Sequence, residues 1–251
     1  MNTKRNAVVI MVALITTCFA APAAMAQVEG APVPDVPVIY TIKGQFSRIS
    51  YNNEGWVTLG YRTANDSQGS DWMLLEAGVT IRKPNPKQTL TRDAFSIKMP
   101  DGSFVPMATQ EEFGKAGYLR ALNARGNTVR DSINYFPIEA NQACAMRFFS
   151  DPTNRAAGIS FDQFEINWQR ACVGRIFFKL PEGQKIEPGQ YWLSVKFADS
   201  IVEAPFRIMT KEEAKYLKKN WKDLKKEHEA FLKSEAEKAK PIELPSTPAL
   251  A

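Results

Sequence analysis

Gly174-Arg175-Ile176-Phe177-Phe178-Lys179-Leu180 is an apolar run that begins two residues after Cys172. A second run, Met146-Arg147-Phe148-Phe149, begins two residues after Cys144. Short apolar and aromatic runs of this kind favour β-strands. We therefore expect the stretch from Ile133 to Leu180, which holds both cysteines inside strand-like runs, to be the structural centre of the chain.

The first 26 residues predict an export signal. Lys4 and Arg5 precede an apolar run of about 14 residues, and Ala24-Met25-Ala26 has the small-x-small pattern of a cleavage site. A membrane anchor is the alternative, but such a run falls short of the roughly 20 residues that span a bilayer. We expect cleavage after Ala26, a periplasmic or secreted product, and no transmembrane segment in the mature chain.

The formal net charge of the chain is +5, and loss of the two basic signal residues lowers it to +3 (5 − 2). This excess is too small to indicate a nucleic-acid partner. In an oxidising compartment, Cys144 and Cys172 predict a disulfide bond. Two independent buried thiols are the alternative.

The segment 27–37 is rich in proline and predicts an extended tether. From 38 to 208 the chain shows short runs of β-branched and aromatic residues between Gly, Pro, Asn and Asp clusters. One run alternates apolar Tyr191, Leu193 and Val195 with other residues, which is typical of a strand with one buried face. Eight or nine such strands predict a mainly β fold, an immunoglobulin-like antiparallel β-sandwich.

A helical insertion is predicted within this domain, at 109–130. Thr109-Gln110-Glu111-Glu112 has the spacing of a capping box, so we expect a helix from about Gln110 to Asn123. Three arginines follow in steps of five and are candidates for binding an anion such as a phosphate or an acidic glycan: Arg120, Arg125 and Arg130. Ordinary surface arginines are the alternative, because steps of five do not align on one helix face.

A long amphipathic helix is predicted at 209–240, after a second capping-box spacing at Thr210, with a disordered tail at 241–251. Its apolar residues recur in steps of three and four, and four of them are candidate partner-binding residues: Leu217, Trp221, Leu224 and Phe231. The stripe is expected either to pack on its own domain or to contact a partner helix or a second copy of the chain.

The sequence predicts no metal site and no cofactor. The one histidine, His228, lies on the terminal helix, so a site with two imidazole ligands is excluded. The chain has no Gly-x-Ser-x-Gly elbow, and bridged cysteines cannot act as nucleophiles. We therefore do not expect an enzyme; a hydrolase with an unrecognised carboxylate site is the third-ranked function.

Trp56 and Trp192 fall on the faces opposite the apolar alternation of their strands. If exposed and coplanar, they would form a sugar-stacking platform; if covered, they would belong to a second core. A carbohydrate-binding module is accordingly the second-ranked function, with a glycan as its ligand. It predicts that Trp56, Trp192 or Trp72 is exposed in a concave face.

The chain resembles exported bacterial proteins with an immunoglobulin-like β-sandwich and no assigned function. The resemblance rests on Asp93 to Gly102, on Arg130-Asp131-Ser132-Ile133-Asn134-Tyr135-Phe136-Pro137 and on the flanking cysteines. It implies a fold and an exported location, and it transfers no catalytic residue. The expected function is a non-enzymatic interaction or accessory module of the cell envelope. It would contact an envelope protein, or a second copy, through the helical insertion or the C-terminal helix.

Overall fold

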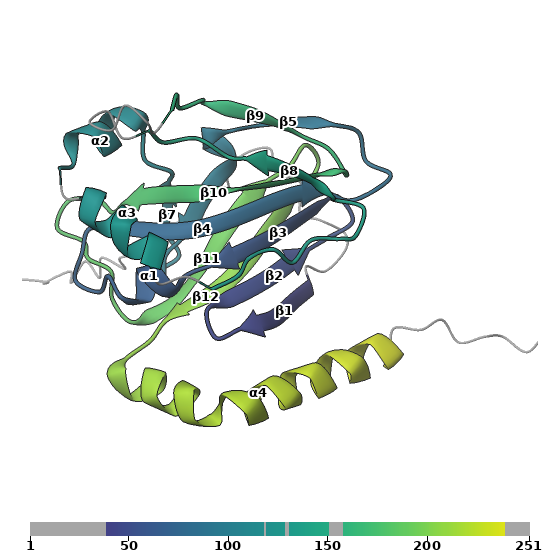
Figure 1. Ribbon diagram of the computed structural model, residues 1–251. Coiled ribbons are helices and arrows are strands. Elements are labelled where there is room, and N and C mark those ends of the chain that lie inside the picture. Colours follow the sequence, from purple (N-terminus) through teal and green to yellow (C-terminus); the bar gives the residue numbers. More distant parts are fainter. Residues whose placement is uncertain (1–38, 118, 129–130, 151–157, 239–251) are drawn as a thin grey trace, which may run out of the picture. The chain divides into compact units, whose positions relative to one another are not determined.

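The structure is a computed structural model that describes residues 39–117, 119–128, 131–150 and 158–238 (Figure 1). The predicted signal at 1–26, the tether at 27–37, Arg130 and the tail at 241–251 lie outside the described residues.

The largest sheet has six strands in the order β1-β2-β3-β4-β10-β8. All neighbouring strands are antiparallel except β10 and β8, which are parallel. Its strands are β1 Ile39–Gly44, β2 Ser47–Tyr51, β3 Gly55–Gly60, β4 Trp72–Ile81, β8 Gln142–Ala145 and β10 Arg170–Lys179.

A second sheet has the order β12-β11-β6-β7, and β5 and β9 form a third, two-stranded sheet. Every pairing in these two sheets is antiparallel. Their strands are β5 Gln88–Thr91, β6 Phe95–Lys98, β7 Phe104–Pro106, β9 Gln163–Ile166, β11 Gly189–Lys196 and β12 Ile201–Ile208.

The helices lie between strands or after the last one. They are α1 Arg62–Asn65, a 3₁₀ turn at Arg92–Ala94, α2 Gln110–Lys115, α3 Leu119–Thr128 and α4 Lys211–Lys238. The prediction of a mainly β protein with a C-terminal helix is confirmed.

The main core lies between the six-stranded and four-stranded sheets. Met73, Leu75 and Val79 of β4 and Leu193 and Val195 of β11 are fully buried in it. The strand period of two turns the other side chains of β4 to the opposite face of the six-stranded sheet. There Trp72 and Leu74 join a second, smaller core with Phe113 of α2. β4 is therefore buried on both faces, as a central strand with a long apolar run should be.

The structure divides the predicted elements more finely. At the start of the predicted β domain, residues 39–51 form the β1–β2 hairpin. The expected helix from Gln110 to Asn123 is two helices, because α2 ends at Lys115 and α3 begins at Leu119. Gly117 lies in this break, and glycine is a poor helix former. The capping box at Thr109 is present, with Glu112 as its partner.

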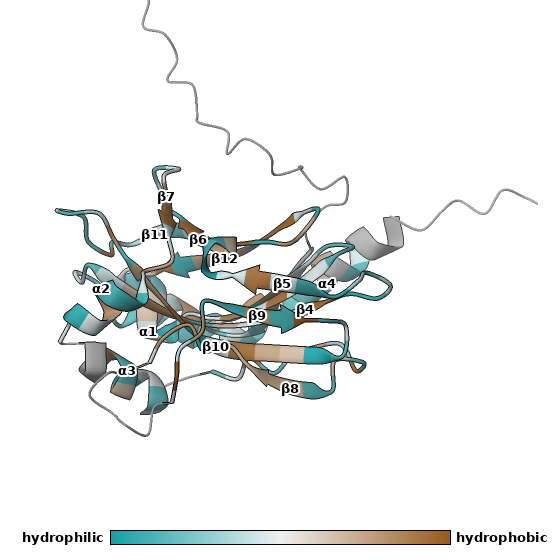
Figure 2. Ribbon diagram, turned by 90° about the horizontal axis from the view of Figure 1, so that it is seen from above, coloured by the Kyte–Doolittle hydropathy of each residue, from teal (hydrophilic) through white to brown (hydrophobic). Residues whose placement is uncertain are grey.

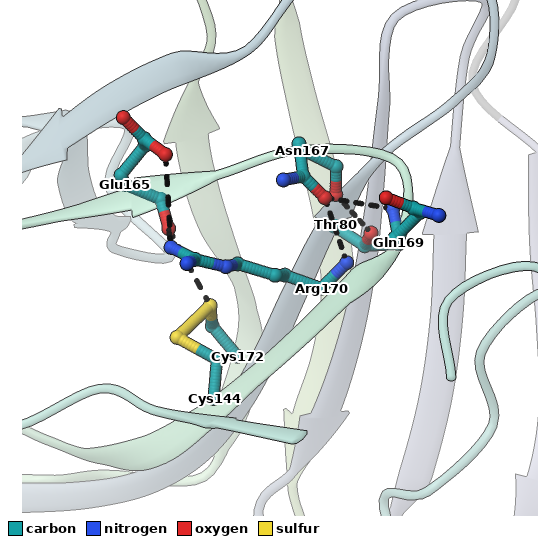
Figure 3. Close-up of a disulfide and its surroundings, with 7 residues drawn as sticks. All are labelled: Thr80, Cys144, Glu165, Asn167, Gln169, Arg170 and Cys172. Atoms are coloured by element: carbon teal, nitrogen blue, oxygen red, sulfur yellow. Dashed lines mark hydrogen bonds and ion pairs between the residues drawn. A yellow bond between two sulfur atoms is a disulfide. The ribbon is translucent and has the colours of Figure 1, made fainter. Parts of the chain in front are cut away.

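The disulfide between Cys144 and Cys172 is also confirmed. It joins directly opposed residues of the parallel neighbours β8 and β10, whose Cα atoms lie 4.1 Å apart (Figure 3). Cys144 lies in a strand, as expected, but the apolar run Met146-Arg147-Phe148-Phe149 that follows it is not part of any strand. β8 is the edge of the sheet, and its residues other than Cys144 are exposed. The bridge thus fastens an edge strand to its neighbour within one sheet.

Within the described ranges, no helix has both the length and the apolar character needed to cross a membrane.

Candidate functional site

The helical insertion returns to the sandwich through residues 131–137, here called the strap. The strap lies on the face of the six-stranded sheet that is turned away from the main core. At its start, Asp131 accepts hydrogen bonds from Arg62, with an Nη2–Oδ1 distance of 2.8 Å. Further along, Ser47 Oγ donates to the Ser132 carbonyl and Trp56 Nε1 donates to the Tyr135 carbonyl. These contacts fasten the strap across β2 and β3.

Gly78 of β4 provides the room for the end of the strap. A Cβ atom at this position would lie 2.5 Å from a ring carbon of Phe136 and 2.4 Å from Thr58 Oγ1. Both distances are below van der Waals contact, so a larger residue would push the strap off the sheet. The strap is therefore a fitted cover for this face, which explains why the polar residue Thr58 beneath it is buried.

A cavity of about 560 Å³ opens between the strap and β10. Its polar groups include Glu76, Asp131 and Arg175, together with Ser132 and Asn134 of the strap. This volume lies within the range of small-molecule sites. Its charges are balanced internally, because Asp131 pairs with Arg62 and Glu76 lies 3.6 Å from Arg175 Nε.

Arg175 also holds α3 against the sheet. Its guanidinium donates to the Asn123 carbonyl at 3.1 Å and to Asn127 Oδ1 at 2.6 Å. Gly126 of α3 lies over the same arginine and Leu74. With these donors committed to α3, the arginine serves mainly as an anchor for the helical insertion. The cavity is therefore a polar gap between the helical insertion and the sheet.

Of the predicted arginine series, only the side chain of Arg125 is described. Arg125 is exposed, and its Nη1 donates to the carbonyl of Asp66 beside α1. The side chain of Arg120 and the whole of Arg130 lie outside the described residues. The anion-binding role of the series therefore stays a prediction.

The two predicted surface tryptophans lie on different sheets. Trp56 of β3 is half-buried and stacked on Tyr51, with ring centroids 4.4 Å apart and an interplanar angle of 7°. Trp192 of β11 is half-buried on the outer face of the four-stranded sheet, where Lys98 Nζ lies 5.3 Å from its ring centroid. Because these outer faces point in opposite directions, the two indoles cannot form one sugar platform.

Trp72, the third tryptophan of the carbohydrate hypothesis, is buried in the second core beneath α2. That hypothesis expected one of the three tryptophans to be exposed in a concave face, and Trp72 is not exposed. Phe113 of α2 packs in the same small core as Trp72. Trp56 is held instead by the strap.

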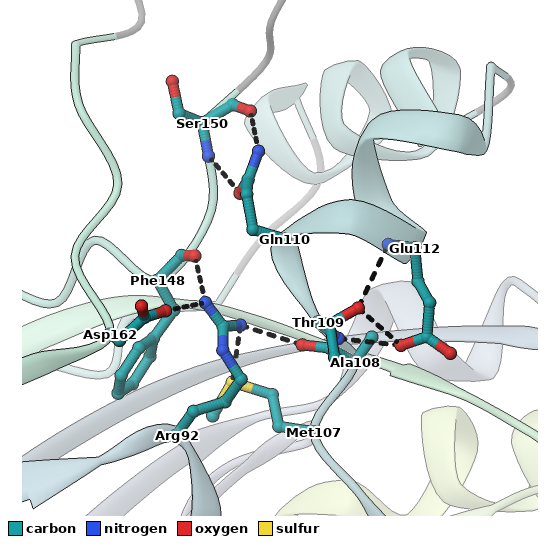
Figure 4. Close-up of polar contacts among 9 residues, drawn as sticks. All are labelled: Arg92, Met107, Ala108, Thr109, Gln110, Glu112, Phe148, Ser150 and Asp162. Carbon is teal, nitrogen blue, oxygen red and sulfur yellow. Dashed lines mark hydrogen bonds and ion pairs between the residues drawn. The ribbon is translucent and has the colours of Figure 1, made fainter.

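Arg92 is a central residue that the sequence did not single out. Its side chain is 11% exposed and donates to the carbonyls of Ala108 and Phe148 and to Asp162 Oδ1 (Figure 4). Its guanidinium also lies 4.7 Å from the ring centroid of Phe149. These partners come from three separate segments, so Arg92 joins the start of the insertion to the loops around it. One arginine after a threonine-rich strand carries no local signal of this role.

The terminal helix α4 begins with the predicted capping box. Glu213 N–H donates to Thr210 Oγ1, and Thr210 N–H donates to Glu213 Oε2. Arg207 adds an ion pair with Glu213 Oε1. The Arg207 guanidinium, and secondly the Thr210 amide, lower the pKa of Glu213 below its ordinary value of 4.5. The start of α4 is thus fixed to the end of β12.

Beyond its first turn, α4 passes beside β1 (Figure 1). Of the four candidate partner-binding residues, Leu217, Trp221 and Leu224 are half-buried, whereas Phe231 is 58% exposed. His228 lies between them in the stripe, and its Nε2 atom is buried with no hydrogen-bond partner within the described residues. The stripe is therefore partly covered near β1 and open at its far end.

Within the described part of the chain, no group of three or more His, Cys, Asp or Glu residues could hold a metal ion. Comparison of the chain with models of protein families, with curated proteins and with solved structures found no match. The function therefore has to be argued from the surfaces described above.

Proposed function

We propose that this protein is a non-enzymatic interaction module of the bacterial cell envelope and that α4 is the element that contacts its partner. The observation that carries the proposal is the combination of spacing and exposure along α4. Five residues follow one another in alternating steps of four and three, and the last of them is largely exposed: Leu217, Trp221, Leu224, His228 and Phe231.

This spacing is that of the a and d positions of a coiled coil. A helix of 28 residues is about 42 Å long, so it extends well beyond the width of one neighbouring strand. The remaining faces carry Lys and Glu, which keep the helix exposed to solvent without favouring a membrane surface. The partner proposed here is a helix of another envelope protein with apolar residues at matching intervals.

His228 supports a specific partner over indiscriminate apolar contact. A polar residue at one seam position can fix the register of a coiled coil. His228 occupies such a position in the stripe, between Leu224 and Phe231. The composition agrees with a non-enzymatic role, because the one histidine lies on this helix and the two mature cysteines are bridged.

An exported location and an immunoglobulin-like sandwich belong to the same proposal. The disulfide and the predicted signal support export. Two facing sheets around one core support the sandwich. In antibody domains the conserved bridge connects the two sheets, whereas here it connects neighbours in one sheet. The likeness therefore concerns architecture and not the details of the immunoglobulin core.

Photo-crosslinking in intact cells tests the role of α4. A photoreactive phenylalanine analogue would replace Phe231, which is 58% exposed, and as a matched control Phe104 of β7, which is 48% exposed. We expect one discrete crosslinked envelope protein from position 231 and none from position 104. The crosslink should disappear when Leu217 and Leu224 are both replaced by serine, provided that thermal unfolding shows the sandwich intact.

The proposal fails if positions 231 and 104 give the same products, or if position 231 gives none. A crosslink to a second copy of the chain would replace the heterologous partner with self-association. Sedimentation of the purified protein distinguishes these outcomes.

A further inference from the structure

The two larger sheets have four edge strands, β1, β8, β12 and β7, and β8 differs from the other three. Exposed edges can pair with other chains, and proteins protect them with proline, charge, short length or a covering element. β12 contains Pro205 with Glu203 and Arg207, and β7 has three residues and ends at Pro106. β1 contains Lys43 and has α4 beside it. β8, with the sequence Gln-Ala-Cys-Ala, is short, but it has no proline and no charged residue and, among the described residues, no strand or helix beyond it.

The main chain of β8 offers hydrogen-bonding groups on its open side. Gln142 N–H donates to the Gln169 carbonyl, and Met146 N–H donates to the Val173 carbonyl. Main-chain groups alternate in direction along a strand, so the intervening Ala143 and Ala145 point away from β10. Among the residues that the structure describes, their N–H and C=O groups have no hydrogen-bond partner outside the ladder. In Figure 2, β8 lies beside β10 with no further strand beyond it.

The bridge between Cys144 and Cys172 makes this edge rigid. It ties Cys144 of a four-residue strand to Cys172, the third residue of a ten-residue strand. A strand this short would otherwise separate easily from its neighbour. Because the edge is already ordered, an incoming strand does not have to order it, which favours binding.

The open part of the edge is bounded at both ends. On one side, Asn141 N–H already donates to the Glu139 carbonyl, and on the other, the Arg147 carbonyl accepts from Phe161 N–H. The open part of the edge, here called the window, therefore consists only of the outward N–H and C=O groups of Ala143 and Ala145. Such a window is too small for the roughly 1,200 Å² or more of a stable dimer interface, but it fits one extended peptide.

The side chains around the window indicate what such a peptide should carry. Ala143 and Ala145 are small, uncharged and exposed, so they do not obstruct an added strand. Phe161 at one end is 55% exposed and provides an apolar contact. We propose that β8 binds an extended, uncharged segment of another polypeptide as an added strand, with an apolar side chain of that segment packed on Phe161.

A library of random dodecapeptides displayed on phage provides the probe, with the full-length oxidised protein as the target. Selected peptides would be synthesised, and their affinities measured for the wild type and three variants. Ala143→Pro removes an outward N–H without removing a bond to β10, whereas Ala143→Ser keeps that N–H and is the matched control. We expect Ala143→Pro to weaken binding about tenfold, Phe161→Ser to weaken it less, and Ala143→Ser to leave it unchanged.

A second measurement does not depend on the folding of any variant. On binding, the amides of Ala143 and Ala145 in the wild type should become protected from hydrogen exchange, and those of β12 should not. Peptides that bind Ala143→Pro as tightly as the wild type, or that leave both alanine amides unprotected, would overturn the proposal. So would failure of the selection to yield any binder. Wild-type dimers that Ala143→Pro dissociates would make a second copy the occupant and overturn the peptide assignment.

This binding surface is independent of the role proposed for α4. Phe231→Ser should leave the affinity for a selected peptide unchanged, and Ala143→Pro should leave the photo-crosslink at position 231 unchanged. Failure of one proposal is thus distinguishable from failure of the other.

Discussion

The two edges of the six-stranded sheet are treated in opposite ways. At one edge, β1 is accompanied by α4, a helix that follows the last strand of the fold. At the other edge, β8 has no strand or helix beyond it in the described part of the chain and is held to β10 by a disulfide bond. The first edge has a separate element beside it, whereas the second is covalently fastened and left open.

The difference shows that an edge strand has two separate requirements: attachment to its neighbouring strand and protection from pairing with other chains. β1 is attached through its hairpin with β2 and is accompanied by α4. β8 has only four residues and a parallel neighbour, so its hydrogen bonds alone would attach it weakly. The bridge supplies attachment but no protection, and it is this unprotected edge that we propose to be a binding surface.

The largest effect is expected from removal of the bridge. In the double variant Cys144→Ala and Cys172→Ala, the separation of 28 residues predicts a loss of about 3.5 kcal/mol in the free energy of unfolding. Urea unfolding followed by tryptophan fluorescence measures this loss. Hydrogen exchange should become faster in β8 and remain unchanged in β1. A loss below about 1 kcal/mol would mean that β8 is held chiefly by its packing.

A smaller effect is expected from Gly174→Ala, which disturbs the exit of the chain from β8. The new Cβ atom would lie 2.1 Å from the Met146 carbonyl oxygen, so the main chain after β8 has to move. We expect a loss of about 2 kcal/mol in the free energy of unfolding, as for other overpacked sites. Gly117→Ala is the control, because no atom lies within 4 Å of its added Cβ. Equal stability of the two variants would show that the β8 side is not tightly packed.

The sequence predicts local structure well where one residue pattern determines it. The alternation of Tyr191, Leu193 and Val195 placed these side chains in the core, and the spacing from Thr210 to Glu213 placed the start of α4. The bridge followed from compartment and cysteine number. Each of these predictions rests on neighbouring residues or on a chemical rule, so no knowledge of distant contacts was needed.

Edges and covers could not be predicted in this way. Cys144 lies beside apolar residues in the sequence, yet β8 is an exposed edge, because edge position depends on which strands pair. The strap has no periodic pattern, and its position depends on Gly78 in a distant strand. For the same reason, the outward alanines Ala143 and Ala145 carried no signal of a binding surface until the sheet order was known.

A third effect, smaller than that of Gly174→Ala, is expected at the β1 edge when the cap of α4 is removed. Thr210→Ala eliminates the acceptor for Glu213 N–H and should cost about 1 kcal/mol of local helix stability. Hydrogen exchange should become faster in the first turns of α4, whereas β8 should be unaffected. Thr109→Ala, which removes the corresponding cap of α2, is the matched control and should leave α4 unchanged. Equal exchange in α4 for the two variants would show that contacts other than the cap hold the helix start.

The smallest effect is a pH dependence of the same helix start. The pKa of Glu213 is lowered in the folded protein, first by the Arg207 guanidinium and then by the Thr210 amide. A lowered folded pKa means that this stabilisation is fully present above the ordinary value of 4.5 and is lost as the pH falls through the folded value. Acidification below 4.5 should therefore loosen the first turn of α4 before β8 changes, since the bridge does not titrate.

Glu213→Gln should abolish this acid response in hydrogen exchange. Glu111→Gln is the control, because the pKa of Glu111 is also lowered, by Lys115, but this pair lies in α2. An acid response of α4 that persists in Glu213→Gln would place the titrating group elsewhere and remove the ionic link between β12 and α4.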